Sequence, residues 1–398
     1  MSSGLSRNVT DARMIISNRM AGIQPFFVME VLSRAKALER QGRDIIHMEI
    51  GEPDFPTPPL VIEYATEFMR RGDIRYTPAA GLPELREAIS KYYRDRYGVC
   101  VASERIFITP GASGGFLLAM GLLLNEGDKV LLTDPGYPCY SNFIRLFGGT
   151  PSLVSVDGST NFHFTSEILS ARWDSRTKGA VIASPSNPTG NVLQPDKLKT
   201  LIDGLEQRSA FLIADEIYHG LEYDKPSPTA LTFSDRVFVV NSFSKYFGMT
   251  GWRLGWLVVP ADSIDDAEKL AQNIFISAPA PSQYAALASF TEPNLEELER
   301  RRRVFQERRD FLCEQLQEIG FSLSTIPSGA FYVYADCSRF TSNSLDFALG
   351  LLEDTGVAVT PGKDFGKNSP ESHLRFSYAV THDRLAAAMT RIRRFVQR

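Results

Sequence analysis

The sequence predicts an α/β fold, with a large three-layer α/β/α domain built on a mainly parallel β-sheet and a smaller α+β domain. Between residues 105 and 245, short apolar runs end in polar or glycine-rich turns, and a helical spacing of apolar residues usually follows. Strands that alternate with helices in this way favour a parallel sheet with helices on both faces. The length of 398 residues exceeds the usual size of one hydrophobic core and indicates two domains. After residue 292 the repeat gives way to a long charged helix, which marks the second domain.

The elements before the repeat are helices, a short strand and a loop. In chain order, we predict a helix over residues 28–40, a strand over 45–50, a proline-rich loop over 51–58 and a helix that begins at Pro83. Gly42 is suited to end the first helix, because glycine adopts the left-handed conformation common after a helix. Proline is favoured at the first position of a helix, where its missing N–H would have no partner.

The strands of the repeat are rich in β-branched residues, which is typical of strands buried on both faces. They are expected at residues 105–109, 129–134, 179–183, 211–215 and 237–240. Ligands of parallel α/β sheets gather at the carboxyl ends of the strands. Because each of these strands is followed at that end by a polar cluster, we expect the functional site there.

The charged helix is predicted from Pro293 to about Ile319, with Gly320 ending it. Its basic run, residues 300–303, follows glutamates at the stabilising four-residue spacing, so we interpret it as a solvated helix face. Further strands are expected at residues 330–334, 357–359 and 373–378, and a last helix over 383–396. We predict a large domain of residues 47–290 and a small domain built from both chain ends, residues 1–46 and 291–398.

Composition argues against several classes of function. A net charge of −4 gives no reason to expect a nucleic acid or an anionic membrane as a partner. The four cysteines are scattered and the five histidines are dispersed, so we expect neither disulfides nor a metal site. The N-terminus lacks the apolar core of a signal peptide, and the longest apolar run, residues 116–124, is too short for a membrane span. We therefore expect a cytoplasmic protein.

Residues 242–256 concentrate the chemistry. Lys245 stands where a buried strand ends, and loss of hydration there disfavours the ammonium form and favours a nucleophilic amine. Ser242, Ser244 and Arg253 add hydroxyls and a permanent cation, which suit an anion. An aldehyde that carries a phosphate, such as pyridoxal 5′-phosphate, would match this set. Taken alone, the lysine could also simply cap a strand beside a glycine-rich turn.

The stretch matches S-x-S-K-x-x-G-x-x-G-x-R-x-G and resembles the lysine signature of class I and II aminotransferases. The similarity runs from about residue 28 to the C-terminus and is closest to the bacterial aspartate/alanine/aromatic group. It implies the fold type I architecture of pyridoxal phosphate-dependent transferases. It also implies a homodimer with shared active sites, in which Tyr76 reaches the phosphate of the neighbouring subunit.

The resemblance gives further residues a role in cofactor binding. Asp215 would pair with the protonated pyridine nitrogen, although backbone amides could equally hold an aspartate at that strand end. Tyr218 and Asn187 would donate to the phenolate oxygen, and Tyr137 would stack on the ring. The glycine-rich segment before the apolar helix offers free N–H groups for a phosphate, a weak signal by itself. Its candidates are Ala112, Ser113 and Gly114.

The same resemblance assigns the substrate α-carboxylate to Arg375, helped by Gly51 and Asn187. The implied activity moves the amino group of an L-amino acid to a 2-oxo acid through a Schiff base on Lys245, with ping-pong kinetics. Residues 261–285 contain no arginine for a second carboxylate, so we expect an alanine-like or broad substrate, with glutamate and 2-oxoglutarate as one pair. The alternative is a C–S β-lyase on the same fold. A more remote one is the ligand-sensing domain of a regulator, which would need a DNA-binding module.

Overall fold

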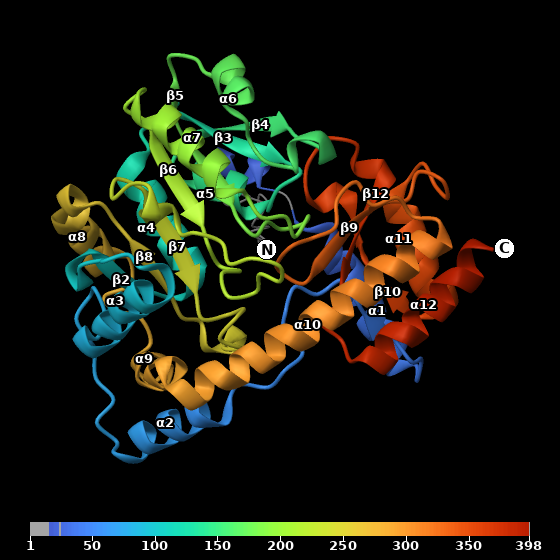
Figure 1. The fold of residues 1–398 in the computed structure, drawn as a ribbon, viewed down its shortest axis with the longest axis horizontal. Helices are drawn as coiled ribbons and strands as arrows, with labels where there is room; N and C mark the ends of the chain where they lie inside the picture. The colour runs from blue at the N-terminus through green and yellow to red at the C-terminus, as the bar shows by residue number, and fades with distance from the viewer. Residues whose placement is uncertain (1–15, 24, 398) are drawn as a thin grey trace, which may run out of the picture.

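The computed structural model describes residues 16–23 and 25–397, and it confirms the α/β class (Figure 1). Its centre is a seven-stranded sheet in the order β2-β8-β7-β6-β5-β3-β4. The strands are β2 (Ile106–Thr109), β3 (Lys129–Asp134), β4 (Thr150–Ser155), β5 (Thr177–Ala183), β6 (Phe211–Asp215), β7 (Phe238–Ser242) and β8 (Gly255–Val258). All neighbours pair in parallel except β8, which is antiparallel to both β2 and β7.

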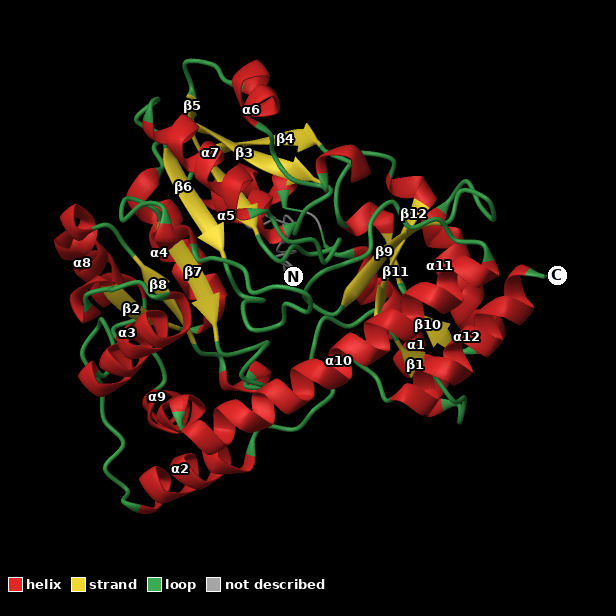
Figure 2. Ribbon diagram, in the orientation of Figure 1, coloured by secondary structure: helices red, strands yellow, loops and turns green. Residues whose placement is uncertain are grey.

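Helices cover both faces of this sheet (Figure 2). Successive residues of each strand point to opposite faces, and because both sets of side chains are apolar, each face forms a hydrophobic core with the helices on its side. Val130 and Leu132 of β3 pack with α4, α5 and α8, whereas Leu131 points to the side of α3, α6 and α7. The helices of this unit are α2 (Pro59–Arg70), α3 (Pro83–Tyr97), α4 (Gly111–Leu123), α5 (Cys139–Leu146), α6 (Ser166–Arg172), α7 (Pro195–Glu206), α8 (Ile264–Ile274) and α9 (Ala280–Ala286). This arrangement is the three-layer order that the sequence predicts.

A smaller group of elements lies beside the sheet and contains a three-stranded and a two-stranded sheet. The elements are α1 (Phe27–Arg40), β1 (Ile46–His47), β9 (Tyr332–Asp336), α11 (Ser344–Thr355), β10 (Val357–Ala358), β11 (Thr360–Pro361), β12 (His373–Ser377) and α12 (His382–Val396). The long helix α10 (Glu292–Ile319) runs from the large unit into this group (Figure 1).

The two chain ends meet in the smaller group. β1 pairs in parallel with β10, and Val31, Ala35 and Leu38 of α1 share a core with Leu352 of α11. We propose on these contacts that residues 47–290 form one domain, and residues 1–46 with 291–398 the other. β1 straddles the proposed boundary, and residues 1–15 of the first segment lie outside the described part of the chain.

Three strands and one surface differ from the sequence expectations. β4, β8 and the two-residue β11 were not predicted, and β8 was missed because it begins inside the glycine-rich stretch that is typical of a turn. Position 255 requires glycine because the backbone of α4 passes close to it, and a Cβ there would lie 2.9 Å from the backbone nitrogen of Ala112. The prediction of a fully solvated basic run is wrong for Arg301, which is buried and donates to the carbonyl of Pro56 at 2.7 Å.

No helix within the described residues combines the length and the apolar character that crossing a bilayer requires.

Candidate active site

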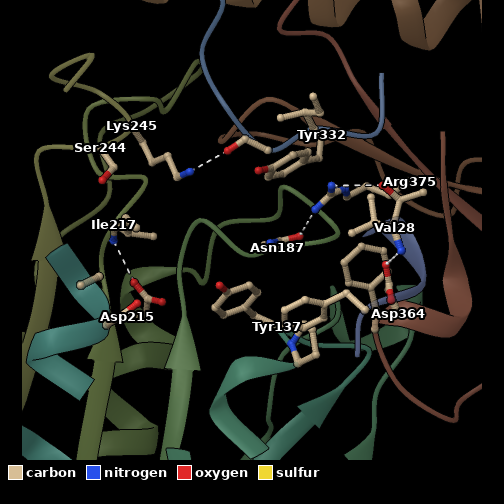
Figure 3. A pocket seen from close by; sticks show the side chains of 18 of the residues that line it. Val28, Tyr137, Asn187, Asp215, Ile217, Ser244, Lys245, Tyr332, Asp364 and Arg375 are labelled. Carbon is tan, nitrogen blue, oxygen red and sulfur yellow. Dashed lines mark hydrogen bonds between the residues drawn. The ribbon is translucent and has the colours of Figure 1, made fainter. Parts of the chain in front are cut away.

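A cavity of about 370 Å³ opens at the carboxyl ends of β5, β6 and β7, between the sheet and the smaller group (Figure 3). It has two ends of different character. The lysine end is lined by Ala112, Ser113, Asp215, Ser244, Lys245 and Arg253. The arginine end is lined by Gly51, Asn187, Thr360, Asp364 and Arg375. Tyr137 and Tyr332 lie between the two ends (Figure 3).

Lys245 follows β7 and extends its amine into the cavity. Its Nζ donates a hydrogen bond to the carbonyl of Gly51 at 2.6 Å, which joins the two ends of the cavity (Figure 3). Burial lowers the pKa of Lys245 to about 8, and the negative charge of Glu52 opposes this fall. About a tenth of the amine is therefore neutral at pH 7, far more than for an exposed lysine, and this form can accept a proton or attack a carbonyl.

Asp215 ends β6 and is only 4% exposed. Its carboxylate accepts hydrogen bonds from the hydroxyl of Tyr140 at 2.5 Å and from the backbone N–H of Ile217 at 3.0 Å. Burial raises the pKa of Asp215 to about 6, and the Tyr140 hydroxyl counteracts part of that rise. At pH 7 the group is mostly ionised, with lone pairs free for a cationic partner in the cavity. Glu216 turns the other way and accepts from Thr229 and Ala230.

Arg253 places a cation beside the first turn of α4. It adopts a left-handed φ of 54°, and a Cβ on Gly111 would lie 2.6 Å from its Nη2. Ala112 and Ser113 line the cavity at the same place, where the first N–H groups of a helix have no intrahelical partner. A guanidinium, free helix N–H groups and the hydroxyl of Ser244 together form a seat for an anion.

Tyr137, Tyr218 and Tyr332 line the cavity between its ends, and Asn187 lies beside them at the arginine end. The hydroxyls of Tyr218 and Tyr332 are 2.9 Å apart, and burial raises the pKa of Tyr218, so it stays a donor at neutral pH. Tyr137 makes an edge contact with Tyr140, with ring centroids 5.3 Å apart. The side-chain oxygen of Asn187 accepts from Arg375 Nη1 at 2.9 Å, which leaves the amide N–H₂ to point elsewhere (Figure 3).

Arg375 of β12 is held at the arginine end and is 5% exposed. Besides Asn187, its Nη2 donates to the carbonyl of Glu49 at 2.6 Å, and its guanidinium lies over the ring of Tyr332 at 4.3 Å. Its Nε is buried and has no partner among the described residues. A guanidinium fixed in this way on the cavity wall is suited to an anionic oxygen that enters the cavity.

Three residues that the sequence analysis expects at the site do not line the cavity of this chain. Ser242 is behind Ser244 and donates to the carbonyl of Leu254 at 3.1 Å, because β7 turns it away from the cavity. Gly114 is on the face of α4 that packs on Thr109 and Pro110. Tyr76 is 81% exposed and does not line the cavity of its own chain. The other predicted site residues all line the cavity.

Sequence reasoning missed Tyr140, Tyr332 and Asp364. Tyr140 lies in the first turn of α5, three residues after Tyr137, and the two rings meet edge to edge, so its closeness in sequence to a predicted site residue is a usable signal. Tyr332 is on a strand that was predicted, but its hydroxyl lies where a Cβ on Gly51 would be 2.5 Å away, a contact that no local pattern indicates. Asp364 is the last residue of a short turn, Gly362–Asp364, which has no periodicity.

Comparisons with known proteins agree with this geometry. The family model described as "Aminotransferase class I and II" matches residues 43–392. A valine–pyruvate aminotransferase of Mycobacterium tuberculosis is 39% identical over 374 residues, which are 94% of this chain and 96% of that protein.

Solved structures match over nearly the whole chain. A crystal structure of an aminotransferase from M. tuberculosis superimposes with a TM-score of 0.93 at 38% identity, covering 96% of this chain and 99% of that one. The aspartate aminotransferase of Thermus thermophilus with maleate gives a TM-score of 0.90 at 32% identity, with 96% and 99% coverage.

Proposed function

The chain belongs to the class I and II aminotransferases, which are pyridoxal phosphate-dependent transaminases, and we propose that it acts on apolar, alanine-like L-amino acids. Glutamate and 2-oxoglutarate are proposed as one of its exchange pairs. The relative named for valine and pyruvate supports an apolar donor.

The residues of the lysine end fit the family's cofactor. Lys245 supplies an amine with a lowered pKa for an aldehyde, and Arg253 with the start of α4 supplies the seat for a phosphate. Asp215 is a buried carboxylate with no cationic side chain in hydrogen-bonding contact among the described residues, so a protonated ring nitrogen would match it. Tyr218 and Asn187 would hold the ring oxygen, and Tyr137 would lie against the ring face.

The bound cofactor supplies an aldehyde carbon and an electron-withdrawing ring. Lys245 acts as the base that takes the proton from the substrate α-carbon, because burial lowers its pKa to about 8 and so keeps about a tenth of the amine neutral at pH 7 and about half at pH 8. Asp215 holds a negative charge at its strand end, and Tyr140 keeps that carboxylate oriented. Arg375 binds the substrate α-carboxylate, and the stack on Tyr332 prevents the guanidinium from following the substrate as it moves.

The observation that carries the choice of substrate is the lining of the cavity. Its cations among the described residues are Lys245, Arg253 and Arg375, and each has a proposed task already. The arginine end is closed instead by Phe26, Val28, Met29, Leu32 and Phe365. An apolar side chain packs against such a wall, whereas a second carboxylate would need a cation from another subunit.

A homodimer with shared active sites is supported by an exposed apolar surface. Ile62, Tyr64 and Met69 of α2 and Ile74 after it are exposed, and Tyr76 follows them on the same segment. Neighbouring exposed apolar side chains of this kind mark protein–protein contacts. If a second copy covers this surface, Tyr76 is free to reach the phosphate seat of the partner.

The test is a screen of the holoenzyme against the twenty L-amino acids with 2-oxoglutarate or pyruvate as acceptor. The proposal predicts the highest kcat/KM for alanine-like and branched apolar amino acids and at least about tenfold less for aspartate. Preference for aspartate would overturn it. Release of ammonia and pyruvate from a sulfur-containing amino acid without an acceptor would support the lyase instead.

A further inference from the structure

Asp364 binds the first turn of α1 from a distant part of the chain. Its Oδ1 accepts from the backbone N–H of Phe27 at 2.6 Å. Its Oδ2 accepts from the backbone N–H of Val28 at 2.7 Å (Figure 3). Residue Phe26, at the N-cap position of α1, has no side-chain cap of its own. Asp364 therefore replaces the missing cap, and each of its oxygens holds one otherwise unpaired N–H.

The turn that Asp364 holds is also the apolar wall of the arginine end. Phe26, Val28, Met29 and Leu32 line the cavity, while Val31, Ala35 and Leu38 of the same helix pack on α11. Upstream, the 3₁₀ helix η1 (Asn18–Gly22) lies by α5 of the large unit, where Arg19 Nη1 donates to the carbonyl of Leu146 at 2.7 Å. The described N-terminal residues thus contact both units: η1 contacts the large unit, and α1 packs in the smaller group.

Asp364 is placed to hold this wall and the substrate carboxylate site in one arrangement. It is 7% exposed and lies in the short turn η8 (Gly362–Asp364). The next residue, Phe365, stacks its ring under the guanidinium of Arg375 at 4.9 Å. Burial raises the pKa of Asp364, and the N–H groups of Val28 and Phe27 and the charge of Arg375 oppose that rise. One rigid turn therefore sets the distance between Arg375 and the apolar wall.

We propose that Asp364 is a positioning residue for substrate selection, which fixes the wall against which the side chain of the bound amino acid packs. The inference rests on the proposed function for the identity of the substrate. A fixed wall discriminates between side chains that differ by one methylene by about tenfold or more, whereas a loose wall adapts to each of them. Both oxygens of Asp364 are engaged by the N–H groups of Phe27 and Val28, so it should change the choice of substrate more than the chemistry.

The experiment compares the wild-type holoenzyme with Asp364→Ala and Asp364→Asn. Steady-state kinetics on alanine, 2-aminobutyrate, valine, leucine and phenylalanine give the spread of kcat/KM across side-chain sizes. Asp364→Ala is expected to narrow that spread of kcat/KM by about fivefold or more, the size of effect that loss of a helix cap gives. The change should come from KM rather than from kcat. Asp364→Asn keeps one acceptor oxygen and should fall between the two. If Asp364→Ala fails to fold, the comparison of wild type with Asp364→Asn still tests the proposal.

Two further readouts separate this proposal from the proposed function. Hydrogen–deuterium exchange of peptides within residues 27–40 should speed up in both variants, most in Asp364→Ala. Calorimetric binding of propionate, isovalerate and 3-phenylpropionate measures size discrimination without turnover. If wild-type enzyme turns over none of the amino acids, the proposed function fails, while the binding series still decides the role of Asp364.

The matched control is Thr165→Ala, which removes the side-chain cap of α6, where Thr165 Oγ1 accepts from the N–H of Ile168 at 3.2 Å. That helix does not line the cavity. Thr165→Ala should lower the stability of the protein about as much as Asp364→Ala does, and it should leave the spread of kcat/KM unchanged. An equal loss for all five amino acids in Asp364→Ala, or an unchanged spread, would overturn the proposal and leave Asp364 a purely structural cap.

Discussion

The two ends of the cavity are built in different ways. At the lysine end, Asp215, Ser244 and Lys245 sit at or just after the carboxyl ends of the adjacent strands β6 and β7. At the arginine end, the residues come from segments around positions 28, 50, 187 and 364–375, which meet only in the folded chain. The first end is fixed by one sheet, and the second depends on how the two units pack. On the proposed function, the chemistry resides in the fixed end and the choice of substrate in the assembled one.

The strongest test of the lysine end is Lys245→Ala. Turnover should fall by about 10⁴-fold or more, because the variant loses both the nucleophile and the base. The measurement is kcat with the preferred amino acid after incubation with excess cofactor. Lys269→Ala is the control, since that exposed lysine forms only a surface ion pair with Asp266. Retention of wild-type kcat in Lys245→Ala would show that the base lies elsewhere.

A smaller effect is expected at the arginine end. Arg375→Lys keeps the charge but loses the planar fork, its stack on Tyr332 and its bond to Asn187. KM for the amino acid should rise by roughly 10- to 100-fold, and kcat should change less. Arg300→Lys on the exposed face of α10 is the matched control. A loss confined to kcat would place Arg375 with the chemistry and remove the contrast between the two ends.

The hydrogen bond between Tyr140 and Asp215 gives the lysine end a pH dependence. Because the pKa of Asp215 is about 6, the cofactor-free protein should bind pyridoxal phosphate more weakly as pH falls through 6 and the carboxylate becomes neutral. Tyr140→Phe removes a bond that lowers this pKa, so the transition should move to higher pH and affinity near pH 6 should drop about threefold. Equilibrium binding of the cofactor, followed by fluorescence across pH, measures both the pH of the transition and the affinity near pH 6. An unmoved transition would mean that Tyr140 does not set the charge of Asp215.

The smallest expected effect concerns the support behind the arginine end. A hydrogen bond with Glu49, and a weaker one with Glu39 of α1, raise the pKa of His47 to about 9. Its charged form therefore stabilises the fold fully below pH 6.5, and this contribution is lost as pH rises from 6.5 to 9. His47→Gln should lower Tm by no more than about 3 °C at pH 6 and by nothing near pH 9.5, since the pair is partly exposed.

A difference between wild type and His47→Gln that grows with pH would contradict the sign of this linkage.

The contrast between the ends also explains what the sequence could predict. Lys245 and Asp215 are recognisable because each lies in a local motif at the end of an apolar strand, and Arg253 because it belongs to the same motif as Lys245. The strand order brings such ends together. Asp364 and Tyr332 act across the packing of two units, and neither has a neighbouring residue that indicates its partner. Arg301 shows the same limit, because the spacing of its glutamates correctly indicates an ion pair with Glu297 but not the burial caused by residues 54–56.

The central claim is that Lys245 carries the cofactor, and one labelling experiment tests it most directly. The holoenzyme is reduced with borohydride and digested with trypsin, which cannot cleave after a modified lysine. The account predicts a single labelled peptide that spans residues 237–253, uncut at Lys245. Label on any other lysine, or a cofactor that reduction fails to fix, would contradict it.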